Sequence, residues 1–252
     1  MGLEENKLVS VITPVFNCSK YIRQSIQSIL DQTYKNFEFI ILDDGCTDKT
    51  CHMVSDFSDK RIKLIGSNVN MGVPFRRNQG VKTARGKYIL IHDGDDISLV
   101  NRIELQVNYL NQISDVFCVG GYAIKIDVNE NVVGKMEYPP LKHDDIVKKI
   151  KHGPLNPMID PTVMFRKKDF IELGLYSLDK KVRLVQDLDL WTRAILSGKI
   201  LANIPIPLIK YRTNPDGITE KNKLAMIRSH VGVVSRFIRE TIRIKELKLK
   251  EG

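Results

Sequence analysis

The 252-residue sequence lacks any apolar run that approaches the roughly 20 residues needed to cross a bilayer. Its first seven residues are polar and acidic, and they do not resemble a secretory signal. It contains no internal repeat or low-complexity tract, and its glycine and proline contents are ordinary, which excludes a fibrous or disordered class. We therefore expect a folded, cytoplasmic protein.

Cysteines are few, and their spacing does not match a metal site. Only Cys46 and Cys51 lie close together, and no second pair or histidine cluster completes a set of zinc ligands. We expect reduced thiols. Apolar residues make up 42% of the chain, which is enough for the core of one large domain, alone or with a small appendage.

The formal net charge of +9 is unevenly distributed. Residues 221–252 contain nine basic and three acidic residues, a surplus of six. A nucleic-acid-binding protein more often spreads such charge over a folded face, so we expect no nucleic-acid partner. Apolar residues at helical spacing in 219–252 predict a basic helical tail. Packing on the domain, dimerisation and peripheral membrane contact all remain open for it.

Short apolar runs alternate with amphipathic segments before residue 115. The pattern predicts strands at 8–16, 37–42, 61–65 and 88–91, and helices at 19–32, 47–57, 74–83 and 102–112. Such alternation is typical of βαβ units in a parallel sheet, where ligands bind beyond the carboxyl ends of the strands. Further along, we expect strands at 116–127, 132–136 and 162–165, and helices at 144–151 and 185–196, with an irregular segment at 139–161.

Polar clusters follow three of the expected strands. Asp93-Gly94-Asp95-Asp96 places three carboxylates within four residues, and these repel one another unless a cation lies between them. Mg²⁺ and Mn²⁺ prefer such oxygen ligands, and Gly94 leaves room for a pyrophosphate. The alternative is an acidic turn in which Asp96 caps the next helix.

Two further strand ends carry candidate nucleotide-binding groups. Asp44 can accept a hydrogen bond from a base or a ribose, and Phe16 offers a ring on which a base can stack. Arg76 and Arg77 begin a helix at the same edge, and arginine suits diphosphates or base edges. Each group has a structural alternative. Asp44 can belong to an ordinary strand-to-helix turn, Phe16 can be a core aromatic, and the two arginines can form a solvated basic turn.

Taken together, these segments resemble the family 2 glycosyltransferases in order and spacing over about residues 8–215. The resemblance is carried by the segments 10–17, 32–34, 37–48, 70–72, 77–80 and 84–96. It implies a GT-A fold, an α/β architecture with a Rossmann-like, mostly parallel central sheet flanked by helices. The implied organisation is a nucleotide-sugar-binding half at 1–115, an acceptor-binding half at 116–218 and the helical tail at 219–252.

The resemblance also implies roles for residues that bind the nucleotide. Phe16 matches the ring that stacks on the base, and Pro14 contributes backbone contacts. Asp44 matches the carboxylate that reads the base, with Arg77 as its basic neighbour. Phe16 and Asp44 together fit a uracil base, so UDP is the expected nucleotide.

The metal-binding DxD motif of the family matches Asp93 and Asp95. Asp95 is the expected direct ligand of Mn²⁺ or Mg²⁺, and Asp93 lies nearer the ribose, with Gly94 beside the nucleotide. Residues 211–219 resemble the loop that closes on the donor. Asn214 stands there where the family often has histidine, and it is a secondary candidate ligand.

The catalytic base implied by the resemblance is Asp187, in the segment Gln186-Asp187-Leu188-Asp189-Leu190-Trp191. Gln186 departs from the family, which usually has glutamate there. We expect a structural role for Asp189 and a core position for Trp191.

The implied function is metal-dependent, inverting transfer of a sugar, in the hexosyltransferase class, from a nucleotide-sugar to a hydroxyl of a glycan, lipid-linked or protein-linked acceptor. Such an activity belongs to polysaccharide biosynthesis. Two alternatives are a nucleotide-sugar-binding module that has lost turnover and a sugar nucleotidyltransferase. The latter needs a glycine-rich, arginine-containing phosphate loop after the first strand, where this chain has Asn17-Cys18-Ser19-Lys20.

Overall fold

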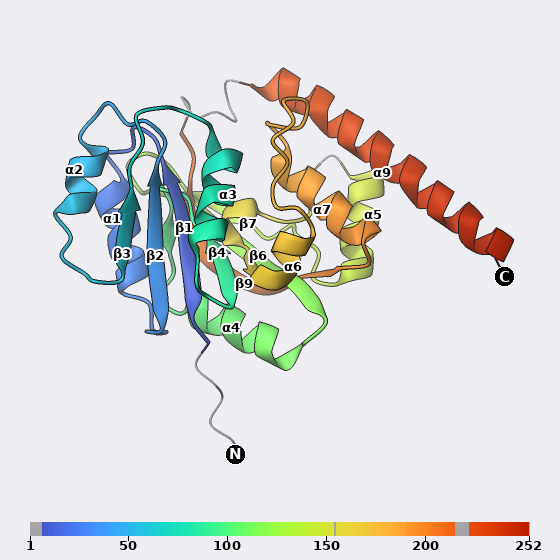
Figure 1. Ribbon diagram of the computed structural model, residues 1–252, viewed down its shortest axis with the longest axis horizontal. Helices are drawn as coiled ribbons and strands as arrows, with labels where there is room; N and C mark the ends of the chain where they lie inside the picture. Colours follow the sequence, from blue (N-terminus) through green and yellow to red (C-terminus); the bar gives the residue numbers. More distant parts are fainter. Residues whose placement is uncertain (1–6, 154, 215–221, 252) are drawn as a thin grey trace, which may run out of the picture.

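The computed structural model describes residues 7–153, 155–214 and 222–251. Within these residues the chain forms one nine-stranded sheet in the order β3-β2-β1-β4-β8-β6-β9-β5, with β7 paired to β6 (Figure 1). The strands are β1 (Val9–Val15), β2 (Phe37–Asp43), β3 (Ile62–Ile65), β4 (Tyr88–Ile91), β5 (Ile97–Ser98), β6 (Val116–Ile126), β7 (Val132–Met136), β8 (Met164–Arg166) and β9 (Ile200–Arg212).

The strands β3, β2, β1 and β4 form the parallel sheet expected for the first half of the chain. Every residue of β1 and β2 is buried, as is typical of a parallel strand with helices on both faces. Alternate side chains enter opposite cores: Ile12 packs in one, and Val9 and Val11 pack in the other.

The second half of the chain extends the same sheet in mixed directions. Strand β8 is antiparallel to both β4 and β6, whereas β9 is parallel to β6 and antiparallel to β5. Strand β9 was not predicted because Pro205 and Pro207 interrupt its apolar pattern. The β6–β9 pairing accommodates the prolines with shifts in register near Tyr122.

Helices cover both faces of the sheet and give three layers. The helices are α1 (Ile22–Leu30), α2 (Thr50–Ser55), α3 (Val73–Thr83), α4 (Arg102–Gln112), α5 (His143–His152), α6 (Lys167–Glu172), α7 (Gln186–Leu196) and α9 (Lys223–Glu251), with a 3-10 turn, η1, at Asp160–Thr162. Side chains of α1, α2 and α4 fill the first core, on one face of the sheet. Those of α3, α5, α6 and α7 fill the second core, on the other face. The short helix α6 had no clear periodic pattern in the sequence.

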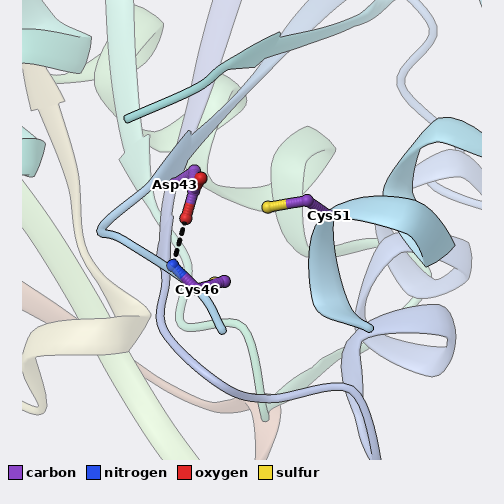
Figure 2. A group of neighbouring side chains, drawn as sticks. All are labelled: Asp43, Cys46 and Cys51. Carbon is purple, nitrogen blue, oxygen red and sulfur yellow. Dashed lines mark hydrogen bonds between the residues drawn. The ribbon is translucent and has the colours of Figure 1, made fainter. Parts of the chain in front are cut away.

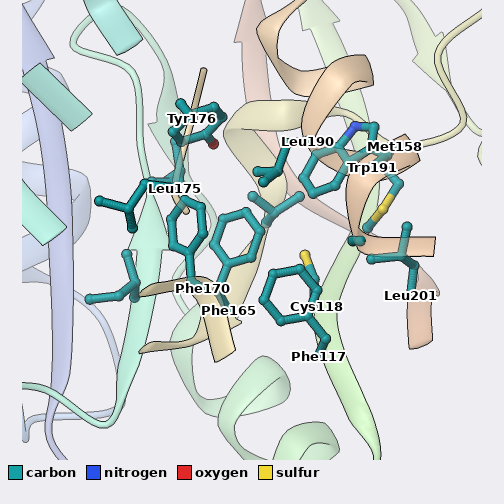
Figure 3. Close-up of a cluster of buried hydrophobic side chains, with 14 of the residues drawn as sticks. Phe117, Cys118, Met158, Phe165, Phe170, Leu175, Tyr176, Leu190, Trp191 and Leu201 are labelled. Atoms are coloured by element: carbon teal, nitrogen blue, oxygen red, sulfur yellow. The ribbon is translucent and has the colours of Figure 1, made fainter. Parts of the chain in front are cut away.

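An aromatic cluster forms the centre of the second core (Figure 3). The rings of Phe165 and Phe170 stack with centroids 4.3 Å apart, and Trp191 stacks on Phe165 at 5.8 Å. Trp191 is fully buried, so its expected core position is confirmed. Its burial fixes α7 against the sheet and thereby positions the first turn of that helix.

Helix α9 is the expected helical tail, and it packs on the outer side of α7 and α5. Val233 and Phe237 are its buried contacts with the second core. Its C-terminal part extends beyond the body of the molecule (Figure 1). Among the described residues, no helix is long and apolar enough to cross a membrane.

Candidate active site

The polar clusters predicted from the sequence meet at one edge of the sheet. Strands β1, β2 and β4 are parallel, so their carboxyl ends lie together there. Phe16 follows β1 with half of its surface exposed, which makes its ring available to a ligand. Pro14, by contrast, is buried within β1, where its backbone lies beside Leu42 of β2.

Asp44 holds the turn before α3 against the end of β2. Its carboxylate accepts hydrogen bonds from the backbone N–H groups of Met71, at 2.7 Å, and Gly72, at 2.9 Å. It also accepts one from Nε of Arg76, at 2.9 Å. The basic neighbour of Asp44 is therefore Arg76, and the prediction that Arg77 takes this place is wrong.

Arg77 instead connects the acidic turn after β4 with η1. Its guanidinium donates to Asp93, at 2.8 Å, and to Asp160, and it lies over the ring of Tyr176. Burial alone would lower the pKa of Arg77, but the charges of Asp160 and Asp93 raise it well above its usual range. The side chain is a buried, permanently charged bridge between two carboxylates, and Tyr176 donates a further hydrogen bond to Asp160, at 2.9 Å.

The acidic turn 93–96 concentrates carboxylates in a partly buried place. Burial, together with the charge of Asp93, raises the pKa of Asp95 to about 6. The pKa of Asp96 is raised well above its usual range by burial and by the charges of Asp95 and Asp93. A Cβ on Gly94 would lie 3.1 Å from Val15 and 3.2 Å from Cys18, so glycine lets this turn approach the end of β1 closely.

The chemistry of this turn fits a divalent cation. Carboxylates that raise one another's pKa are stabilised when a cation lies between them, and oxygen ligands suit Mg²⁺ and Mn²⁺. Within the described residues, the buried Oδ2 of Asp96 has no hydrogen-bond partner. Asp93 and Asp95 are the residues of the turn with exposed surface, and they are the ones positioned to contact a ligand.

Arg212, at the end of β9, also forms hydrogen bonds with the acidic turn. Its backbone N–H donates to Asp96 at 2.8 Å, and its Nε donates to the carbonyl of Asp95 at 2.9 Å. Asp96 therefore bonds to β9, and it is not the N-cap of α4, which is Asn101. Asn214 lies two residues beyond Arg212, and the rest of the predicted donor-closing loop, 215–219, falls outside the described residues.

Asp187 lies in the first turn of α7 and is partly exposed. Its Oδ2 accepts a hydrogen bond from Nδ2 of Asn156, and its Oδ1 accepts one from the backbone N–H of Leu188 at 2.8 Å. Burial raises the pKa of Asp187 from 3.8 to about 7, with the charge of Asp160 as the second cause. A carboxylate with a pKa near neutrality is suited to accept a proton.

Asp189, two residues further along α7, is buried and paired with two arginines. It accepts from Arg193 at 2.8 Å and from Arg236 of α9. Its role is structural, in line with the sequence-based expectation, because it joins α7 to α9. Gln186 has a buried Oε1 without a hydrogen-bond partner in the described part of the chain.

A second group of potential metal ligands, Asp43, Cys46 and Cys51, lies at the end of β2 (Figure 2). Oδ1 of Asp43 already accepts from the N–H groups of Cys46, at 2.8 Å, and Gly45, at 3.0 Å. Burial raises the pKa of Cys51 to about 11, and the pKa of Cys46 is raised further. Because Asp43 is already engaged by these backbone N–H groups, we interpret this group as a cap on the turn.

Three residues of the site were not identified from the sequence. Asp160 and Asn156 come from the irregular segment 139–161, and Tyr176 lies in the loop before α7. Such loop residues have no periodic pattern, and only their contacts with Arg77 and Asp187 reveal them. The Asp160-Pro161 pair, a common turn signal, was the one hint in the sequence.

Comparisons with known proteins identify the family of this chain. The sequence profile described as Glycosyl transferase family 2 matches residues 10–174. A glycosyltransferase of Methanocaldococcus jannaschii is 33% identical over 235 residues, which cover 91% of this chain and 79% of the relative. The Escherichia coli protein WfgD, a UDP-Glc:alpha-D-GlcNAc-diphosphoundecaprenol beta-1,3-glucosyltransferase, is 30% identical over 236 residues, or 93% of this chain and 88% of that protein.

Solved structures share the fold at low sequence identity. TarS of S. aureus in complex with UDP-GlcNAc superposes with a TM-score of 0.68 and 17% identity, covering 92% of this chain and 72% of that chain. The mannosyltransferase PcManGT from Pyrobaculum calidifontis, in complex with GDP-Man and Mn²⁺, gives 0.66 and 16%, covering 93% and 64%. The fold is therefore GT-A, as expected. The chain belongs to glycosyltransferase family 2, and it is a glycosyltransferase enzyme.

Proposed function

We propose that this enzyme transfers a sugar from a UDP-sugar to a hydroxyl of a lipid-linked glycan, with inversion at the anomeric carbon. The observation that carries the proposal is the arrangement of two acidic groups around Arg77. The acidic turn 93–96 lies on one side of this arginine, and Asp160, whose charge acts on Asp187, lies on the other. Arg77 and Asp160 thus connect the proposed donor-binding turn with the candidate base.

The donor end of the proposed site is formed by Phe16 and Asp44. The half-exposed ring of Phe16 offers a surface on which a uracil can stack. Asp44 is 4% exposed and has three protein hydrogen bonds; a carboxylate has about four acceptor positions, and in the proposal the base uses the remaining one, on Oδ2. The UDP-GlcNAc bound to TarS and the UDP-Glc named for WfgD support a uridine donor.

In the proposed reaction, Asp187 removes the proton of the acceptor hydroxyl while its oxygen attacks the anomeric carbon. The bond from that carbon to the diphosphate breaks on the opposite face, which inverts the configuration and releases UDP. Asn156 holds one oxygen of Asp187 and the N–H of Leu188 holds the other, so the carboxylate is oriented. General-base assistance of this kind contributes roughly 10²–10⁴-fold to the rate.

Asp93 and Asp95 are the residues that would hold a divalent metal, and Asn214 remains a secondary candidate. When bound, Mn²⁺ or Mg²⁺ supplies Lewis acidity that stabilises the departing diphosphate. Arg77 holds the side chain of Asp93 in place, and Arg212 fixes the backbone of Asp95. The Mn²⁺ in the GDP-Man complex of PcManGT supports a metal in this fold.

The acceptor class is supported by WfgD, whose named acceptor carries a diphosphoundecaprenol group. This relative covers 93% of the chain, so the comparison includes the acceptor-binding half proposed at 116–218.

The test is release of nucleoside diphosphate from a panel of nucleotide sugars, with a diphosphoundecaprenol-linked sugar as acceptor. We expect UDP release from a UDP-sugar with Mn²⁺ or Mg²⁺, and loss of release with a chelator and in Asp95→Ala. Asp115→Ala is the matched control, because Asp115 is an exposed carboxylate after α4, outside the site. Binding of a donor without turnover would favour a binding module, and pyrophosphate release would identify a nucleotidyltransferase.

A further inference from the structure

Helix α9 has two separate apolar faces, and the domain covers only one of them. Val233 and Phe237 are buried, and Arg236 beside them pairs with Asp189 of α7. These contacts fix which side of α9 faces the body. The other apolar side chains of the helix have to be placed relative to this packing face.

A second apolar stripe runs along α9 away from the body. Its members are each more than half exposed: Leu224, Ile227, Val231, Ile242 and Leu249. At about 100° per residue they fall within an arc of about 60°, whose centre lies about 130° from the packing face. Single exposed apolar residues are common on proteins, but five of them aligned along one side of a helix indicate an interaction surface.

Exposed basic side chains border this stripe. Arg228, Arg239 and Arg243 lie on one flank, and Lys245 projects from the stripe itself. The acidic residues Glu240 and Glu246 leave this surface with a positive balance. An apolar stripe beside arginine and lysine is the pattern of helices that lie in the interface of an anionic membrane.

We infer that α9 docks the enzyme on an anionic lipid surface, with the stripe inserted among the lipids and the arginines against the headgroups. A second copy of the chain fits less well. Antiparallel pairing of two such stripes would bring the flanking arginines of both copies together, and in either direction Lys245 would place a charge in the apolar contact. The charge of the surface therefore favours an anionic lipid as the occupant.

The attachment of α9 gives this docking a fixed orientation. The Arg236–Asp189 pair joins α9 to α7, and Asp187 lies in the first turn of α7. A membrane contact along α9 therefore holds the domain at a set angle to the lipid surface. Docking of this kind requires neither a nucleotide sugar nor transfer, so it can be measured separately from the proposed reaction.

The experiment is sedimentation of the full chain with vesicles of phosphatidylglycerol or of phosphatidylcholine, at low and high salt. We expect binding to phosphatidylglycerol that weakens with salt. The variant Ile227→Gln/Val231→Gln/Ile242→Gln keeps good helix formers and should bind at least about tenfold more weakly. Neutralising Arg228, Arg239 and Arg243 with glutamine should cost about fivefold per charge.

The matched control replaces three exposed apolar residues elsewhere, Val132, Val133 and Ile171, with glutamine, and it should bind as the wild type does. Asp187→Asn should also bind normally, which separates docking from catalysis. Equal binding by the stripe variant and the wild type would overturn the inference, as would no binding to phosphatidylglycerol at low salt. A dimer seen by light scattering, lost in the stripe variant, would assign the stripe to a second copy instead.

Discussion

The substitution Asp187→Asn is expected to abolish most transfer and, at the same time, to stabilise the fold at alkaline pH. Burial raises the pKa of Asp187 from 3.8 to about 7, so the folded protein holds a proton on this carboxylate that the unfolded chain releases. Stability therefore falls as the pH rises from about 4 towards 7, because the unfolded state binds fewer protons. Asparagine carries no charge, and this loss disappears in the variant.

The magnitude follows from the displacement of the pKa. Each pKa unit corresponds to about 1.4 kcal/mol. Relative to acid pH, the raised pKa therefore lowers the stability of the wild type by about 2 kcal/mol at pH 5, where only the unfolded chain has released the proton, and by about 4 kcal/mol at pH 8. The side-chain oxygen of asparagine can still accept from Asn156, but one of the two hydrogen bonds is lost, at about 1 kcal/mol. Between pH 5 and 8 the stability of the variant relative to the wild type should rise by about 2–3 kcal/mol.

The assay is urea unfolding of both proteins at several pH values, combined with UDP release at saturating donor and acceptor. Asp189→Asn is the control on the same helix. Asp189 pairs with Arg193 and Arg236, so its substitution should destabilise the protein across this pH range. Transfer by Asp187→Asn should fall by about 10²–10⁴-fold.

Two results would refute this reasoning. If Asp187→Asn retained most of its transfer rate, Asp187 would not be the base. If the difference in stability between variant and wild type did not change with pH, the pKa of Asp187 would not be raised by its surroundings.

Two further predictions concern the donor and the base. Phe16→Ala should weaken UDP binding by about 5- to 100-fold, because stacking on a base contributes about 1–3 kcal/mol. The thermal stability of the variant should change little, because the ring is half exposed. Calorimetric titration with UDP tests the first effect, and thermal unfolding tests the second. The kcat/KM of the wild type should rise with pH through an apparent pKa near 7, as Asp187 loses its proton, and a profile already flat from pH 5 upwards would contradict this assignment.

The parallel half of the sheet could be predicted from the sequence because its strands are short apolar runs between amphipathic helices. Strand β9 could not, since Pro205 and Pro207 remove the pattern by which a strand is found. Residues 200–212 form a strand because they pair with β6, and residues 116–126 of β6 lie far away in the chain.

In the site, the sequence indicated the strand ends but not the pairing of side chains. Arg76 and Arg77 are adjacent on α3, and consecutive residues of a helix point about 100° apart. Only the packing of α3 decides that Arg76 faces Asp44 while Arg77 faces Asp160. Asp160 itself comes from an irregular segment, so its part in the network depends on tertiary structure alone.

The way β9 crosses the molecule limits how this enzyme can be recombined with its relatives. Strand β5 comes from the first half of the chain and has β9 as its partner, and β4 has β8. Arg212, at the end of β9, also holds the backbone of the acidic turn. A chimera that exchanges everything after residue 115 would thus replace the residues that hold the acidic turn together with the proposed acceptor half. A graft meant to change only acceptor choice should keep β8, β9 and the segment with Tyr176 and Asp187 between them from the original chain.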